Sequence, residues 1–173
     1  MPQVVTPINF RDVDQFMDWE TSLGWDIQGT QLSPGPSEIG FDHLTFPGLI
    51  VSHFYSRQAM LNVFEPPAGV VIFPILRGPT PVTWNGMEIP PKLIPFVGPG
   101  RTHRVVIPAG WDCYEFIVAV DLIWKTEVFP REFLDKEMST GHPTIPLVGP
   151  VAHQFVRRLD RIFQESRSST GPD

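Results

Sequence analysis

The sequence has few of the features that mark secreted, membrane-spanning or nucleic-acid-binding proteins. Its single cysteine, Cys113, cannot form a disulfide within the chain, which is typical of a reducing compartment. The net charge is −6, so the chain lacks the positive patch that contact with a phosphate backbone needs. The longest unbroken apolar run, Phe116 to Val120, is too short to cross a bilayer, and the N-terminus shows no signal-peptide pattern. We therefore expect a cytoplasmic chain that by itself binds neither membrane nor nucleic acid.

The motifs of common enzyme classes are also missing. The sequence contains no Gly-x-Ser-x-Gly elbow, no glycine-rich phosphate loop and no dinucleotide-binding fingerprint. Cys113 lies inside a predicted strand, away from a helix N-terminus that would activate it, so we interpret it as a buried, inert thiol. No His-x-His pair occurs, whereas a divalent catalytic metal needs about three converging ligands. We predict a non-catalytic chain with no metal and no other cofactor.

Proline and aromatic residues, in contrast, are abundant. The 173 residues include 20 Pro, 13 Phe and 5 Trp. Prolines are dense between Pro66 and Pro108, and this excludes a long helical bundle because each would remove a helical hydrogen bond. The large side chains are numerous enough to form a core, so the chain is not disordered.

From Trp25 onward the apolar residues alternate with a period near two, which is typical of short strands. Turn residues separate these strands, and Asn85-Gly86 predicts a type I′ hairpin. Trp111 to Trp124 is the longest strand-like stretch and predicts a central strand. Glu115 falls on the same side of it as Trp111, Cys113 and Ile117, and alternation alone leaves open whether that side faces inward.

A small β-barrel either fills with side chains or holds one small ligand. Residues that combine an apolar body with a polar tip would suit the wall of such a cavity, although for any one of them plain core packing is the more common explanation. On this basis the candidate ligand-binding residues are His53, Tyr55, Trp84 and Trp111.

Helical patterns flank the predicted strands. Asp12 with Gln15 forms a capping box for a short helix that ends by Gly24. After Lys125 the pattern is helical again, first around Pro130 and then from Pro150 onward. The last helix carries a narrow apolar stripe that either lies on the barrel or pairs with the same helix of a second chain. The stripe consists of Val151, Phe155, Leu159, Ile162 and Phe163.

These patterns divide the chain into three parts. Residues 1–125 are predicted to form a barrel with an N-terminal helix, residues 126–166 a helical dimerisation element, and residues 167–173 a linker or tail.

Six short motifs follow one another in a recognisable order. They are Asp12-Val-Asp-Gln-Phe16, Trp25-Asp-Ile-Gln-Gly-Thr-Gln-Leu-Ser-Pro-Gly35, Pro66-Pro-Ala-Gly69, Trp84-Asn-Gly86, Pro99-Gly100 and Pro108-Ala-Gly110. In this order the sequence resembles the N-terminal cupin-like domain of AraC-type transcription regulators. The resemblance implies a mainly β fold: a cupin-like jelly-roll barrel with a short N-terminal helix and two C-terminal helices.

The resemblance also implies a regulatory function. A domain of this kind senses a small-molecule effector or mediates homodimerisation, and a separate helix-turn-helix part, which these 173 residues do not contain, binds DNA. The alternative is a cupin-type metal-dependent enzyme, because Pro99-Gly100-Arg101-Thr102-His103 is similar to the second half of the cupin metal motif. That enzyme would use His103 with His43 or His53.

Overall fold

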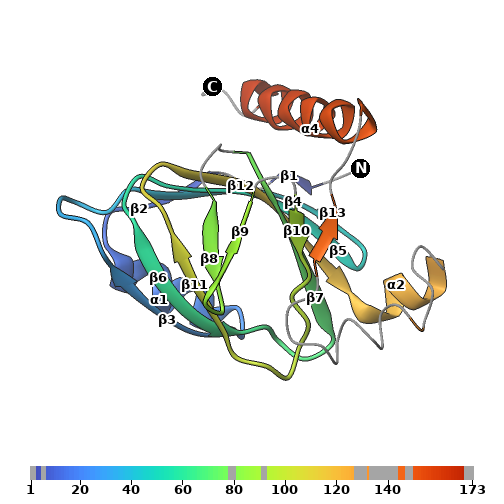
Figure 1. Cartoon of the computed structure of the whole chain (residues 1–173). Helices are drawn as coiled ribbons and strands as arrows, with labels where there is room; N and C mark the ends of the chain where they lie inside the picture. The colour runs from blue at the N-terminus through green and yellow to red at the C-terminus, as the bar shows by residue number, and fades with distance from the viewer. Residues whose placement is uncertain are drawn as a thin grey trace.

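The computed structural model describes residues 3–4, 7–77, 81–90, 93–126, 132, 144–146 and 150–169. Two antiparallel sheets face each other (Figure 1). The first sheet has the order β1-β4-β5-β12-β7, with β2 also paired to β4, and the second has the order β3-β6-β11-β8-β9. The mainly β, cupin-like architecture is therefore confirmed, with the two sheets remaining separate rather than closing into one continuous barrel.

The bounds of the elements are as follows. The strands of the first sheet are β1 (Gln3–Val4), β2 (Ile8–Phe10), β4 (Ile39–Phe46), β5 (Leu49–Ser56), β7 (Val70–Leu76) and β12 (Trp111–Ala119). The strands of the second are β3 (Asp26–Gln31), β6 (Met60–Glu65), β8 (Val82–Trp84), β9 (Met87–Ile89) and β11 (His103–Ile107). A small separate pair joins β10 (Leu93–Pro95) to β13 (Thr144–Pro146), and the helices are α1 (Val13–Ser22), α2 (Val120–Thr126) and α4 (Pro150–Ser169).

Two local predictions are confirmed by backbone geometry. The Asp12 side chain caps α1 by accepting a hydrogen bond from the Asp14 amide at 2.9 Å. Asn85 and Gly86 have φ angles of 48° and 82°, so both adopt the left-handed conformation that a type I′ hairpin between β8 and β9 requires. Short-range turn and cap chemistry thus determines where these elements begin and end.

The main hydrophobic core lies between the two sheets. Alternate residues of each strand point into it, among them Phe41 of β4, Phe54 of β5 and Trp111 of β12. Helix α1 contributes Phe16 and Met17, and the Phe16 ring stacks on Phe41 and Phe54 with centroids 5.5 and 5.9 Å apart. The helix therefore covers one end of the sandwich and closes the interior there.

Helix α4 lies on the outer face of the first sheet (Figure 1). Leu159 and Phe163 are buried there against Leu44, Val51 and Tyr114. The Phe163 ring stacks on the Tyr114 ring with centroids 5.4 Å apart. Both faces of the central strands are consequently covered, one by the second sheet and the other by α4.

The prediction of one strand from Trp111 to Trp124 is wrong in its last five residues. Strand β12 ends at Ala119, and α2 follows immediately. Val120, Ile123 and Trp124 have the i, i+3, i+4 spacing of a helix face and pack in a separate cluster with Phe96. A short, nearly continuous apolar run fits the pattern of a buried strand and that of a helix, so periodicity alone does not show where β12 ends and α2 begins.

Two other expectations concern the C-terminal part. The helix predicted around Pro130, with Phe129, Phe133, Leu134 and Met138, lies outside the described residues. Helix α4 begins at the predicted Pro150 and continues to Ser169, into the stretch interpreted as a tail.

Candidate functional site

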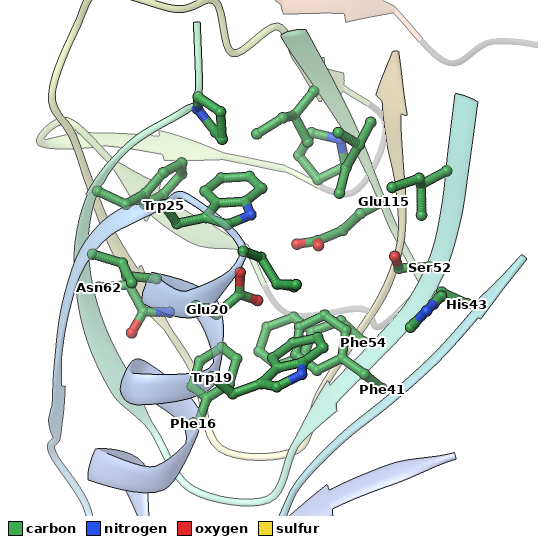
Figure 2. Close-up of a pocket in the computed structure, with 18 of the residues that line it drawn as sticks. Phe16, Trp19, Glu20, Trp25, Phe41, His43, Ser52, Phe54, Asn62 and Glu115 are labelled. Carbon is green, nitrogen blue, oxygen red and sulfur yellow. The ribbon is translucent and has the colours of Figure 1, made fainter. Parts of the chain in front are cut away.

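A cavity of about 590 Å³ lies inside the sandwich, between the two sheets and α1. This volume is within the range of about 300–1,000 Å³ that small-molecule sites occupy. Aromatic and aliphatic side chains form most of the wall (Figure 2). The polar side chains that line it are Glu20, His43, Ser52, Asn62 and Glu115.

Three of these polar residues form one row across the first sheet. His43 of β4 is directly opposite Ser52 of β5, and Ser52 is directly opposite Glu115 of β12. Residues opposite each other on neighbouring strands point to the same face of a sheet. This face is the inner one, so the side of β12 that carries Glu115 points into the cavity.

Two carboxyl groups point into the cavity, and the described residues that line it include no Lys or Arg to balance them. Glu20, on α1, is 8% exposed, and Figure 2 shows its carboxyl pointing into the same space as that of Glu115. Burial, together with the nearby charge of Glu115, raises the pKa of Glu20 from 4.5 to about 8. Burial likewise raises the pKa of Glu115 to about 7, against the effect of the Cys113 thiol 3.8 Å from its Oε1. Both groups are therefore partly protonated near neutral pH.

The other polar groups of the cavity add no positive charge. Burial lowers the pKa of His43, although the charge of Asp42 opposes this, so its ring is neutral at pH 7. Of the described residues that line the cavity, none is Lys or Arg. Asn62 is 7% exposed, and its side-chain oxygen has no hydrogen-bond partner in the described part of the chain.

A second row of residues, on the opposite face of the same strands, holds α4. Asp42 of β4 is opposite His53 of β5, which is opposite Tyr114 of β12. Arg167 of α4 forms an ion pair with Asp42, its Nε 2.8 Å from the Asp42 Oδ2. The Tyr114 hydroxyl donates to Asp160 of α4 at 2.6 Å. We call these five residues the α4 clamp.

Further charges surround His53 within the α4 clamp. Its Nε2 lies 2.9 Å from Asp112 Oδ1, and Arg77 bridges Asp112 and Asp160. Burial would lower the pKa of His53, but the carboxylates of Asp112 and Asp42 outweigh it and raise that pKa. Hydrogen bonds with His53 and Arg167 similarly hold the pKa of Asp42 below its usual value, despite burial. The helix is thus attached by alternating charges as well as by apolar contact.

The structure separates the four candidate ligand-binding residues. Trp84 lines the cavity. Trp111 is buried in the core beside it. His53 and Tyr55 point to the outer face, where Tyr55 donates to the Asn9 side chain at 2.7 Å.

Sequence reasoning missed Glu20 as a cavity residue. The signal was present, because Glu20 continues the stripe of Val13, Phe16 and Met17 at helical spacing and is buried with them. A carboxyl at the fourth position of an apolar stripe indicates a polar group that points into the core.

The histidines of the alternative metal site lie apart. His43 lines the cavity, and His53 belongs to the α4 clamp on the other face of the sheet. The His103 Nδ1 accepts from the Trp84 indole at 3.3 Å. Within the described ranges, no three His, Cys, Asp or Glu side chains are grouped so that they could hold a metal ion. The ligand set that the alternative requires is not assembled there.

The apolar stripe of α4 is divided between two surroundings. Leu159 and Phe163 are buried on the sheet, whereas Phe155 and Ile162 are 41% and 43% exposed. The Phe155 ring stacks on Phe116 of β12 along one edge. The fifth member, Val151, has a side chain outside the described part.

The chain is similar to a known protein in its fold. No protein-family profile and no curated protein sequence matches the chain. The crystal structure of the AraC-like transcriptional activator CuxR matches over 92% of this chain, with a TM-score of 0.59 and 11% sequence identity. The fold is similar to that of an AraC-like activator. The resemblance carried by the sequence motifs is thereby confirmed at the level of the fold.

The matched region covers 60% of the CuxR chain, so this chain spans less than two thirds of that activator.

None of the described helices is both long and apolar enough to cross a membrane.

Proposed function

We propose that this chain is a non-catalytic regulatory domain of an AraC-type transcription regulator that binds a small-molecule effector between its two sheets. The single observation that carries the proposal is the cavity of about 590 Å³, built into a fold similar to that of an AraC-like activator. Its wall is mostly apolar with a few inward-pointing polar groups, which is the usual composition of a small-molecule site. DNA binding belongs to a helix-turn-helix part outside these residues, and the domain works in the cytoplasm.

The two rows of the first sheet give the effector a route to α4. His43, Ser52 and Glu115 face the cavity, and each is adjacent in its strand to a residue of the outer row, Asp42, His53 or Tyr114. An effector that shifts strand β5 or β12 therefore moves the α4 clamp as well. Only an effector that binds two arrangements of α4 with different affinity changes their populations.

The same helix would join two copies of the chain. Phe155 and Ile162 form an exposed apolar edge on α4, and an isologous dimer would bury this edge against its copy. Leu159, which belongs to the same stripe, is buried against its own sheet, so it is not available to this interface.

A cavity-filling variant tests effector binding. Three tryptophans line the cavity, so binding of small neutral, cationic or anionic aromatic molecules changes the intrinsic fluorescence. Ile117→Phe fills part of the cavity and is expected to abolish saturable binding, while Thr83→Phe on the exposed side of β8 leaves it unchanged. If no molecule of any charge binds saturably, or if Ile117→Phe binds as well as the parent chain, the proposed function is wrong.

Ile162→Asp tests dimerisation. We expect it to convert a dimer to a monomer in sedimentation velocity. His153→Asp is the matched control, because it lies nine residues away on the opposite, exposed side of the same helix. A monomeric parent chain, or a dimer that survives Ile162→Asp, contradicts the dimer interface.

A further inference from the structure

We propose that the ligand of the cavity is an organic cation, with an ammonium group carried on an apolar body. This inference rests on the proposed function, since it names the chemical class of the effector. The charge of the cavity and the chemistry of its wall support it.

The cavity wall carries two acidic side chains and, among its described residues, no basic one. The Glu20 side chain is nine-tenths buried and its carboxyl points into the cavity (Figure 2). No described residue donates a hydrogen bond to that carboxyl, although the Glu20 backbone carbonyl accepts from the Leu23 and Trp25 amides. Glu115 points into the same space, and among the described residues its carboxyl has one donor, the weak Cys113 thiol. A buried carboxylate without a cation or hydrogen-bond donors is costly, and two facing each other are more so. A ligand that brings one positive charge gives an ionised carboxylate its partner and weakens the repulsion between the two groups.

The apolar wall suits the rest of such a ligand. Trp19, Trp25 and Trp84 line the cavity together with several phenylalanines. Indole faces attract ammonium groups through their quadrupole and also contact aliphatic or aromatic chains. Unlike the two carboxyls, these side chains are neutral, so they accept the body of the ligand without adding charge.

Two other ligand classes fit less well. An anion would meet Glu20 and Glu115 without a Lys or Arg among the described lining residues to offset them. A neutral polar molecule could accept hydrogen bonds from the protonated carboxyls, and its affinity would then fall as pH rises. The cation has the opposite dependence, because it binds the ionised carboxyls. The groups that titrate in the cavity are Glu20, Glu115 and His43, with the Cys113 thiol beside them.

The experiment compares three probes of one shape: phenylbutylamine, phenylbutanol and phenylbutyrate. Binding to the whole chain is measured by tryptophan fluorescence from pH 6 to pH 8. At pH 8 we expect the amine to bind at least about tenfold more tightly than the alcohol, as one charge-assisted hydrogen bond supplies. Its affinity should rise about tenfold from pH 6 to pH 8, the change in ionised fraction of a group whose pKa is about 7.

Charge-removing variants assign the effect to the two carboxyls. Glu20→Gln with Glu115→Gln keeps the shape of the cavity and should reduce the amine to the affinity of the alcohol, with no pH dependence. Glu88→Gln, on the exposed part of β9, should behave as the parent chain. The pH series on the parent chain tests the same point without any variant.

The outcomes separate the two proposals. If phenylbutanol binds as tightly as phenylbutylamine at pH 8, the cavity is a binding site, but the proposal that its ligand is a cation is wrong. If phenylbutyrate binds most tightly, the same conclusion holds. If none of the three binds, the cation is wrong, and the cavity-filling experiment above decides whether the proposed function also fails.

Discussion

Glu20→Gln is predicted to stabilise the protein at alkaline pH. The folded chain keeps a proton on Glu20 up to a pKa of about 8, whereas the unfolded chain releases it near 4.5. Stability therefore falls as pH rises through this window and levels off above it. At ~1.36 kcal/mol per pH unit, the full penalty is about 5 kcal/mol, and it is removed when glutamine replaces the carboxyl. This is a large share of the roughly 5–15 kcal/mol that stabilises a typical domain.

Urea unfolding at several pH values measures this effect. Between pH 5 and pH 8 the parent chain should lose on the order of 3 kcal/mol more than Glu20→Gln. With a denaturant slope of about 2 kcal/mol per molar urea, the difference in midpoint changes by roughly 1.5 M. Glu88→Gln controls for the loss of one exposed carboxylate. Parallel pH curves for the parent chain and Glu20→Gln would refute the reasoning, because they would show that Glu20 ionises freely in the folded state.

Two further predictions concern the outer face of the first sheet. Gly40→Ala should destabilise the fold by about 1–3 kcal/mol in urea unfolding, because an added Cβ would lie 2.2 Å from the Tyr55 ring, which is fixed by its bond to Asn9. If the midpoint is unchanged, the close approach of β4 and Tyr55 is wrong. Tyr114→Phe removes the hydroxyl that holds Asp160 and should weaken the docking of α4 by about 1 kcal/mol, seen as faster amide exchange confined to that helix. Arg161→Gln, on the exposed side of α4, should leave the exchange unchanged, and equal exchange in Tyr114→Phe would contradict the role assigned to the α4 clamp.

Local chemistry could be predicted from the sequence because it depends on neighbouring residues alone. The cap at Asp12 and the hairpin at Asn85-Gly86 need only a short polar side chain and a residue tolerant of positive φ. The order of such signals was enough to indicate a mainly β fold.

The inner and outer faces could not be assigned in the same way. Strand β5 is covered on one side by the cavity and on the other by α4, so Ser52 and His53 are both buried. Alternation separates the residues of a strand into two faces. It shows which face points into the core only when the other face is exposed to water. Alternation therefore permits His53 on a cavity wall, whereas in the structure its ring contacts Arg167 of α4, a helix more than a hundred residues later in the chain.

Pro74 lies in β7 opposite Glu115. Its position affects whether a strand of another molecule can pair with the edge of this sheet. Strand β7 is the last in its sheet, paired on one side with β12. On its other side Ile72 exchanges both backbone hydrogen bonds with Val97, and Pro74, two residues further, has no N–H to continue that pairing. A strand of another molecule that approached this edge would find the same missing donor. One of the abundant prolines thus limits edge-to-edge aggregation while its ring forms part of the cavity wall.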